Sequence, residues 1–256
     1  MEKQHPQKVE PKDYIFGTRP VIEAVKSGRE IEKILIQKGL QNESVKELFG
    51  LIRSSNIPVS RVPLVKLDRV TKKNHQGVIC FLSAITYHSI DHIISESFSK
   101  GKVPLVVLLD RITDVRNFGA LARTAEVAGV DALVIPSRGS AQIGQDAMKA
   151  SAGALNFIPI CRSDNLKETI TFLRQSGLQV VASSEKGEST IYSVDLTGPT
   201  ALLLGSEEDG ISPAYLKLTD QLVTIPQTGK IASLNVSVAG AVVIFETIRQ
   251  RMVSSI

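Results

Sequence analysis

The chain of 256 residues has no tryptophan, only two cysteines and no long uninterrupted apolar run. Cys80 and Cys161 each lie in an apolar stretch without a second cysteine nearby. This pattern argues against disulfides and zinc clusters and favours buried, reduced thiols in the cytoplasm. No apolar segment approaches the length of a membrane span, and the charged, proline-containing N-terminus lacks the hydrophobic region of a secretion signal. We therefore expect a cytoplasmic protein without a membrane anchor.

The sequence also lacks any Gly-x-Gly, so the dinucleotide-binding fingerprint is missing and a conventional nicotinamide enzyme is disfavoured. Gly205 and Gly210 have the spacing of a phosphate-binding loop, but Ile211 stands where that loop requires lysine. The three acids between these glycines are consecutive rather than alternate, and no histidine joins them, which does not match a metal loop. We predict no metal site.

Positive charge is concentrated in the first third of the chain. Residues 1–85 contain fifteen Lys and Arg against nine Asp and Glu, a net charge of +6, whereas residues 86–256 contain fifteen against seventeen, a net charge of −2. This asymmetry indicates either that the first part contacts a polyanion or that it has a basic, solvated surface. The length fits one long domain or two unequal ones.

Hydrophobic patterning divides the chain further. We predict a disordered tail over 1–12, a small α/β domain over 13–85, a linker over 86–102 and a second α/β domain over 103–256. The first domain is expected to contain helices at about 19–28, 44–53 and 64–70 and strands at 31–37, 57–62 and 78–85. The second is expected to contain strands at 105–110, 132–135, 157–160, 178–182, 201–204 and 222–225, with helices at 117–128, 145–152 and 164–177, a brief one from 212, and a terminal one reaching 251.

A polar turn in the first domain is rich in groups that bind RNA. Cations with Asn and His suit contacts to phosphates and 2′-hydroxyls, which position an RNA without reading its sequence. The alternative is a turn that is merely soluble. The predicted RNA-binding residues there are Arg69, Lys72, Lys73, Asn74 and His75.

The second domain alternates strands and helices, which indicates a mostly parallel sheet. Ligands bind beyond the carboxyl ends of the strands in such sheets. Three polar loops leave these ends, at 111–123, 205–212 and 225–235. The first contains Arg116 and Arg123 near a helix start, where an anion or an RNA phosphate can bind. The apolar residues of the terminal helix cover much of its circumference, so its burial requires a pocket in its own domain or a second subunit.

Taken together, the three loops resemble the three motifs of the SpoU family of RNA ribose methyltransferases. The first motif is similar to Asn117-x-Gly119 followed by Arg123, and the second to Gly205-x-Glu207-x-x-Gly210. The third is similar to Ile225-Pro226 followed by Ser233-Leu234-Asn235. The first domain, with Phe16-Gly17 and Asn74-His75-Gln76-Gly77, resembles the accessory domain of the bacterial 23S rRNA guanosine 2′-O-methyltransferases, which is similar to ribosomal protein L30e.

The resemblance implies an α/β trefoil-knot methyltransferase domain with a mostly parallel sheet, preceded by an L30e-like domain. It also implies a homodimer through the C-terminal helix and methylation of a guanosine ribose in 23S rRNA, free or within an assembling large subunit. S-adenosylmethionine would be held around Leu204, Gly205, Ile225 and Leu234. The implied catalytic residues are Asn117, Arg123, Glu207, Ser233 and Asn235. Because guanidinium deprotonates only above about pH 12, we expect Arg123 to clamp the target phosphate and stabilise the developing alkoxide.

One departure from the family pattern concerns the second motif. Relatives commonly have glycine and a basic residue after its glutamate, whereas this chain has Glu208-Asp209. The added negative charge opposes a phosphate substrate unless Arg111, Arg116 or Lys230 offsets it. Two other functions remain as alternatives: a tRNA ribose methyltransferase, and a non-catalytic RNA-binding factor for ribosome assembly.

Overall fold

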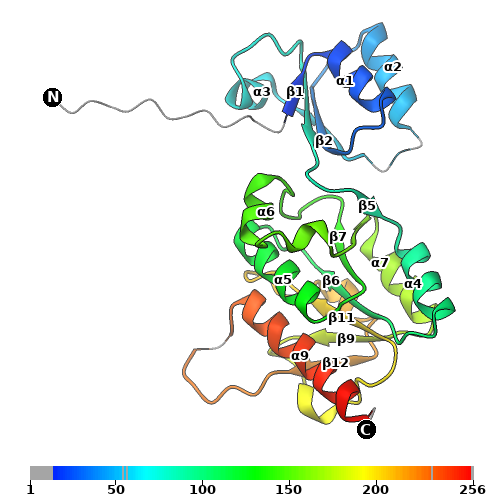
Figure 1. Cartoon of the computed structure of the whole chain (residues 1–256). Helices are drawn as coiled ribbons and strands as arrows, with labels where there is room; N and C mark the ends of the chain where they lie inside the picture. Colours follow the sequence, from blue (N-terminus) through cyan, green and yellow to red (C-terminus); the bar gives the residue numbers. More distant parts are fainter. Residues whose placement is uncertain (1–13, 54, 56, 232, 255–256) are drawn as a thin grey trace. The chain divides into compact units, whose positions relative to one another are not determined.

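A computed structural model of the protein describes residues 14–53, 55, 57–231 and 233–254. The predicted tail over 1–12 lies outside the described residues. The chain divides into two compact units, and the boundary along the chain lies between Ser83 and Ala84 (Figure 1). Within the described residues, no helix has both the length and the apolar character required to cross a bilayer.

The first unit is a four-stranded sheet in the order β1-β4-β2-β3. Strands β2 and β3 are parallel, while β4 runs antiparallel to both of its neighbours. Apolar residues of α1 and α2 pack against one face of the sheet, and α3 packs through Leu67 against part of the other. The elements are β1 (Tyr14–Phe16), α1 (Thr18–Lys26), β2 (Ile31–Gln37), α2 (Glu43–Ile52), β3 (Val59–Val62), α3 (Leu64–Val70) and β4 (Val78–Leu82).

The second unit is built on an eight-stranded sheet in the order β10-β12-β9-β11-β6-β7-β8-β5, and every pair of neighbours is parallel. Its strands are β5 (Tyr87–His88), β6 (Leu105–Leu109), β7 (Ala132–Pro136), β8 (Ile160–Ser163), β9 (Gln179–Ser183), β10 (Ser189–Thr190), β11 (Thr200–Leu204) and β12 (Gln221–Thr224). Its helices are α4 (Ile90–Ser99), α5 (Val115–Val127), α6 (Gln145–Ala150), α7 (Leu166–Gln175), α8 (Pro213–Leu216) and α9 (Val236–Ser254), with short 3-10 turns η1 (Ala154–Asn156) and η2 (Ile191–Ser193).

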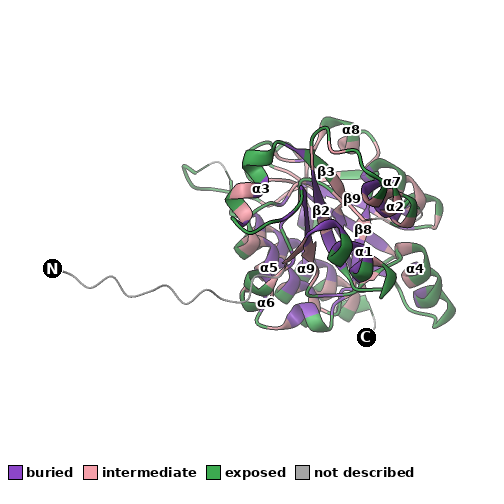
Figure 2. Ribbon diagram, turned by 90° about the horizontal axis from the view of Figure 1, so that it is seen from above, coloured by how far each residue is buried: buried purple, intermediate pink, exposed green. Residues whose placement is uncertain are grey.

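Helices cover both faces of this sheet, so the central strands are buried throughout (Figure 2). Alternate residues of β6 project to opposite sides: Leu105 and Val107 join one core with α5, α6 and α9, while Val106 and Leu108 join the other with α4 and α7. Continuous apolar runs are expected of parallel strands that are buried on both faces. The fold is therefore the predicted α/β class, with a mostly parallel sheet after a small α/β domain, and the trefoil knot expected of the family is consistent with it.

The predicted linker over 86–102 is wrong. This segment forms β5, which pairs with β8, and α4, whose Ile94 is buried in the core of the second unit. Ser97 of α4 also donates a hydrogen bond to Asp131 at 3.2 Å. Ile90, Ile93 and Ile94 have the spacing of a buried helix face, but the many polar residues between them obscured that pattern.

Smaller corrections concern element boundaries. The strand predicted at 157–160 runs instead from Ile160 to Ser163, and Phe157 is 76% exposed. The strand predicted to reach Ile85 ends at Leu82. The helix predicted to begin at Asn117 begins at Val115, because the preceding Asp114 caps it.

Both cysteines are buried and free of disulfides, as predicted. Burial raises the pKa of the Cys80 thiol and of the Cys161 thiol to about 12 each. Because the thiolate is the reactive species, neither cysteine should react with iodoacetamide in the native protein at pH 8. Both should react fully in denaturant, where the thiol pKa returns to about 8.5. Mass spectrometry of the alkylated protein measures this difference, and rapid native alkylation of either thiol would contradict its burial.

Candidate active site

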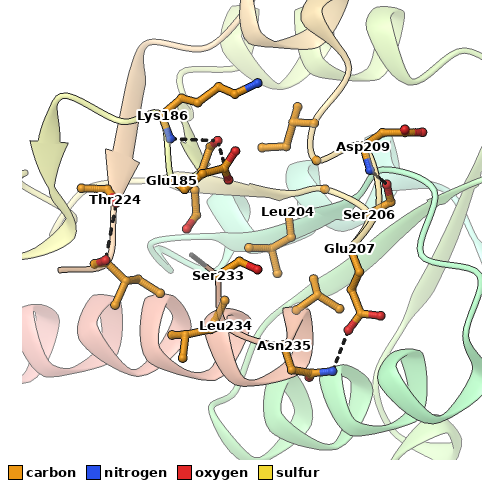
Figure 3. Close-up of a pocket in the computed structure, with 18 of the residues that line it drawn as sticks. Glu185, Lys186, Leu204, Ser206, Glu207, Asp209, Thr224, Ser233, Leu234 and Asn235 are labelled. Atoms are coloured by element: carbon orange, nitrogen blue, oxygen red, sulfur yellow. Dashed lines mark hydrogen bonds between the residues drawn. The ribbon is translucent and has the colours of Figure 1, made fainter. Parts of the chain in front are cut away.

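A cavity of about 450 Å³ opens where the adjacent strands β12, β9 and β11 end. Their last residues, Thr224, Ser183 and Leu204, all line it, as do the loops that follow them and the first turn of α9 (Figure 3). Its size lies in the range of small-molecule sites, and its position is the one where parallel α/β sheets bind ligands.

The loop after β11 folds tightly onto itself at the edge of this cavity. Ser206 and Gly210 exchange backbone hydrogen bonds of 3.0 and 3.1 Å. A Cβ atom on Gly205 would lie 2.2 Å from the carbonyl carbon of Gly210 and 2.3 Å from the nitrogen of Ile211. Position 205 therefore accepts only glycine unless the backbone shifts, and the backbone of this loop forms part of the cavity wall.

The three sequence motifs meet at one carboxylate. Oε1 of Glu207 accepts hydrogen bonds from Nδ2 of Asn117 at 2.9 Å and from Nδ2 of Asn235 at 2.6 Å. Nδ2 of Asn235 also donates to Oδ1 of Asn117 at 3.1 Å, which closes a triangle of side chains from three loops (Figure 3 shows the Asn235 contact). Oε2 of Glu207 has no hydrogen-bond partner among the described residues, so it remains able to accept one from a ligand.

Helix caps hold the two asparagines of this triangle. Oδ1 of Asp114 accepts hydrogen bonds from the backbone N–H groups of Arg116 and Asn117, at 2.8 and 2.9 Å, and thereby caps α5. The bond from Asn117 is the main reason that the pKa of Asp114 is lowered. Oδ1 of Asn235 accepts from N and Oγ of Ser237 at 2.9 and 2.6 Å, at the start of α9. This contact turns the amide NH₂ of Asn235 toward Glu207.

The acidic departure in the second motif is offset within the protein. Nη1 of Arg111 lies 2.9 Å from Oδ2 of Asp209, and its Nη2 donates to the carbonyl of Gly210 at 3.2 Å. Nε of Arg111 pairs with the buried carboxylate of Asp110, whose Oδ2 accepts from the backbone of Ser212 at 2.8 Å. Arg111, Asp110 and the loop after β11 thus form one unit. Of the three cations that the sequence offered to balance Asp209, Arg111 is the one paired with it.

The structure brings most of the predicted site residues together. Ser233 and all four residues predicted to bind the cofactor, Leu204, Gly205, Ile225 and Leu234, line the cavity with Glu207 and Asn235. Arg123 does not line it. It lies six residues after Asn117 on α5, which in an α-helix places it about 9 Å along the axis and about 120° around it. Arg123 is exposed on the outer side of α5, as is Arg116.

Sequence reasoning missed the loop after β9. Ser183, at the end of β9, and Ser184, Glu185 and Lys186 after it line the cavity. Figure 3 shows Glu185 and Lys186 on the side away from Glu207. The available signal was the same as for the other loops, because a polar Ser-Ser-Glu-Lys-Gly stretch directly follows a buried strand.

In the first unit, Arg69, Lys72, Lys73 and Asn74 are exposed, as RNA contacts require. His75 is a correction, because its side chain is buried and both ring nitrogens are engaged. Nδ1 accepts from the backbone of Gly77 at 3.0 Å, and Nε2 lies 3.2 Å from Oδ1 of Asp68. The ring therefore joins the end of α3 to the start of β4, and it is not available for an RNA.

Comparisons with known proteins agree with this arrangement. Residues 104–245 match the model of the SpoU rRNA Methylase family. The chain belongs to this family. Residues 14–88 match a second model, described as RNA 2′-O ribose methyltransferase substrate binding. A relative from Staphylococcus saprophyticus, named as a TrmH family tRNA/rRNA methyltransferase, is 34% identical over 93% of this chain and 95% of its own.

Two solved methyltransferase structures with a similar fold contain AdoMet. The SpoU methyltransferase AviRb from Streptomyces viridochromogenes, in complex with AdoMet, is 26% identical over 94% of this chain and 90% of its own, with a TM-score of 0.60. The AdoMet-bound rRNA methyltransferase from Sinorhizobium meliloti is 25% identical over 92% of this chain and 86% of its own, with a TM-score of 0.57. The cofactor of this SpoU protein is S-adenosylmethionine, and the protein is a methyltransferase that acts on RNA.

The cavity suits this cofactor. Its lining contains four carboxylates, from Glu185, Glu207, Glu208 and Asp209, and one lysine, Lys186. Arg111 pairs with Asp209, so the wall keeps three carboxylates against one lysine. A negative wall favours a ligand that carries a sulfonium cation, since opposite charges attract more strongly in a partly enclosed site. The tight backbone turn at Gly205 also brings peptide groups to the cavity surface, where they can bind the polar ends of the molecule.

Proposed function

We propose that the protein transfers a methyl group from S-adenosylmethionine to the ribose 2′-hydroxyl of a guanosine in 23S rRNA. The observation that carries the proposal is the triangle of Asn117, Glu207 and Asn235 at the edge of the cofactor cavity. RNA binding alone does not require these three side chains to converge beside a small-molecule site. The net charge of +6 on the first domain supports an RNA substrate, and the large rRNA follows from the resemblance of that domain.

S-adenosylmethionine supplies an electrophilic methyl group, and the protein must align a ribose hydroxyl with it and disperse the hydroxyl proton. The two amides hold Glu207 in one position, which leaves its Oε2 facing outward for a ligand. We assign Glu207 and Asn235 to orienting the reactants and Ser233, at the cavity rim, to a hydrogen bond with substrate. Arg123 remains the residue that we assign to the target phosphate and the developing alkoxide.

The proposal is tested by nucleoside mass spectrometry after incubation of the purified protein with S-adenosylmethionine and either deproteinised 23S rRNA, large-subunit precursors or bulk tRNA. A single 2′-O-methylguanosine in the large rRNA is expected. If the methylated nucleoside appeared in tRNA alone, the protein would be a tRNA ribose methyltransferase instead. No methyl transfer to any RNA, together with tight RNA binding, would favour the assembly factor.

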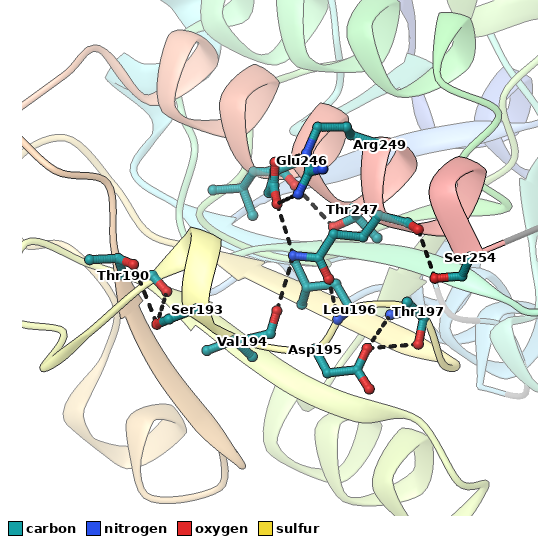
Figure 4. Close-up of polar contacts among 12 residues, drawn as sticks. Thr190, Ser193, Val194, Asp195, Leu196, Thr197, Glu246, Thr247, Arg249 and Ser254 are labelled. Carbon is teal, nitrogen blue, oxygen red and sulfur yellow. Dashed lines mark hydrogen bonds and ion pairs between the residues drawn. The ribbon is translucent and has the colours of Figure 1, made fainter. Parts of the chain in front are cut away.

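We also infer that the protein acts as a homodimer through α9. One side of this helix is held within its own unit: Nε2 of Gln250 donates to the carbonyl of Val194 and to Glu246, and Glu246 pairs with Arg249 (Figure 4). The outer side is apolar and exposed. Val238, Phe245 and Met252 recur every seven residues on it, with exposed fractions of 49, 46 and 65%.

A seven-residue apolar stripe is the pattern of a helix that packs against another helix. Exposed Val127, on the neighbouring α5, extends the apolar surface. The outer side of α5 also carries Arg116, Ala120 and Arg123, at spacings of three and four residues that place them on one ridge. In a dimer formed at this surface, Arg123 of one subunit would lie at the cavity of the other subunit, although it does not line the cavity of its own.

A charge on the apolar stripe should therefore separate the subunits. We expect Phe245→Asp to be monomeric and to lose most methyl transfer, because burying an unpaired carboxylate in a dimer contact costs several kcal/mol. Light scattering coupled to gel filtration measures the mass of the protein. Lys217→Gln, which lowers the net charge by the same one unit at the exposed end of α8, is the control and should leave the mass unchanged. A monomeric wild type would contradict the dimer directly.

A further inference from the structure

The sheet of the first unit carries a row of half-exposed side chains that the proposed function does not use. Tyr14, Phe81 and Lys33 occupy facing positions on the three adjacent strands β1, β4 and β2. The ring centroids of Tyr14 and Phe81 are 5.9 Å apart, and Nζ of Lys33 lies 4.9 Å from the centroid of Phe81. Phe16 faces Ile79 in the neighbouring row, but we count it with this one because its ring lies 6.3 Å from that of Tyr14 and below Nζ of Lys73 at 6.0 Å.

Helix α3 leaves this row partly uncovered. Its Leu67 packs over the next row of the same face, formed by Leu35 and Ile79. The rings of Tyr14, Phe16 and Phe81 retain intermediate exposure. The opposite face of the sheet is closed by two helices instead of one. Aromatic rings are therefore accessible to a ligand on one face only, and a base that stacks on Phe81 or Phe16 would displace the flexible lysine side chain above that ring toward the adjoining phosphate.

The cations beside the rings indicate which ligand fits. Burial lowers the pKa of Lys33, the ammonium group of Lys66 lowers it further, and the neighbouring Glu32 acts in the opposite direction. Helix α3, which carries Lys66, packs on the same face of the sheet as Lys33, so a phosphate bound on this face would meet two positive charges. Exposed Lys73 borders the aromatic row at its other end.

We propose that this row, consisting of Tyr14, Phe16, Phe81 and Lys33, is a platform that stacks unpaired bases of the RNA substrate while Lys33, Lys66 and Lys73 contact the adjoining phosphates. Aromatic side chains across a sheet stack two or three splayed bases in other RNA-binding proteins. Bases within a duplex are stacked on each other and cannot reach such a surface. The inference deepens the proposed function and rests on it: the RNA that is methylated presents a single-stranded segment to the first unit.

The test measures binding of the full-length protein to a fluorescent RNA of about 12 nucleotides, a length within the site sizes of single-strand binders. The RNA contains only A and C, so that it cannot pair with itself, and the duplex with its complement is the second ligand. Phe81→Leu should weaken binding of the single strand about fivefold or more, because base stacking on an aromatic ring is worth at least about that factor. Duplex binding should change less than the single-strand binding does.

Matched controls lie on the opposite face of the same sheet. Arg61 lies 5.1 Å from the ring centroid of Phe49, so this pair has the chemistry of Lys33 and Phe81 without belonging to the row. Phe49→Leu and Arg61→Gln should leave single-strand binding near the wild-type value. Lys33→Gln should reduce the slope of log affinity against log salt by about 0.7, the contribution of one phosphate contact on a single strand.

Equal effects of Phe81→Leu and Phe49→Leu, or equal losses on single strand and duplex, would overturn the platform. Such a result leaves methyl transfer by the wild type intact and so does not touch the proposed function. Conversely, a wild type that binds S-adenosylmethionine but transfers no methyl group to any RNA would refute the proposed function. Circular dichroism and the melting temperature of each variant verify that the first unit, which carries all of these substitutions, is folded.

Discussion

Gly205→Ala should abolish binding of S-adenosylmethionine. The new methyl group would lie 2.2 to 2.6 Å from three backbone atoms of Gly210 and Ile211. No side-chain rotation relieves a clash with backbone, so the loop after β11 must open and the cavity wall must move. A misplacement of about 1 Å in a preorganised site can lower a reaction rate about 100-fold. We expect the affinity for S-adenosylmethionine, measured by isothermal titration calorimetry, to fall by at least the same factor. Core overpacking should also lower the melting temperature.

Gly229→Ala provides the matched control. Gly229 lies in the loop between β12 and α9, near the same cavity, but a Cβ atom there would have no neighbour within 4 Å. Its replacement should leave both affinity and melting temperature close to those of the wild type. Full binding by Gly205→Ala would mean that the loop after β11 does not shape the cofactor site.

Arg123→Ala should lower the rate of methyl transfer by about 100- to 1,000-fold, the loss typical of removing one group that stabilises a developing oxyanion. The affinity for S-adenosylmethionine should stay within about twofold of the wild-type value, because Arg123 lies outside the cavity lining. Single-turnover methylation assays and calorimetry measure the two quantities separately. Arg123→Lys should recover only part of the rate, since ammonium lacks the planar fork that binds phosphate. Loss of cofactor binding would contradict this assignment.

A mixing experiment locates Arg123 relative to the cavity that it serves. Arg123→Ala has an intact cavity, and Gly205→Ala has an intact arginine. If the arginine acts on the cavity of the partner subunit, mixed dimers of the two inactive variants contain one complete site and should recover up to about a quarter of the wild-type activity at equal mixing. If it acts within its own subunit, the mixture stays inactive. The experiment requires that Gly205→Ala elute as a dimer, which light scattering verifies.

Much of the second unit was predictable because its signals are local. The continuous apolar runs of β6 and β11 identify buried parallel strands, and the loops after such strands must meet at one edge of the sheet. The convergence of Glu207 with Asn235 follows from that rule. The segment containing α4 was not predictable in the same way, because only Ile90, Ile93 and Ile94 stand out from a polar stretch and their burial depends on contacts with distant strands.

The sequence alone could not predict which side chains of different loops contact each other. The sequence predicted that His75 contacts RNA, whereas its burial depends on Asp68 at the end of α3 and on the backbone of Gly77. The pairing of Arg111 with Asp209 joins residues 98 positions apart. The sequence indicated that some cation had to balance the extra acid, but only the arrangement of β6 beside β11 determines which one does.

Asn235 both caps α9 and binds Glu207 at the edge of the cavity, and these two roles together restrict the amino acids that the position can hold. Its oxygen caps α9, and its nitrogen donates to Glu207. Asp, Ser and Thr also cap helices well. Asp, however, would set a second negative charge against Glu207, and a single hydroxyl cannot both accept from Ser237 and span the gap to the carboxylate with the same geometry.

Of the good capping residues, asparagine alone presents an acceptor and a donor on opposite arms of one rigid, uncharged group. Asparagine is thus essentially the only residue that satisfies both roles at this position, although either role alone would allow several residues. A substitution at position 207 that removes the carboxylate therefore also removes a partner of Asn235, whose oxygen caps the helix on which we propose that two subunits meet.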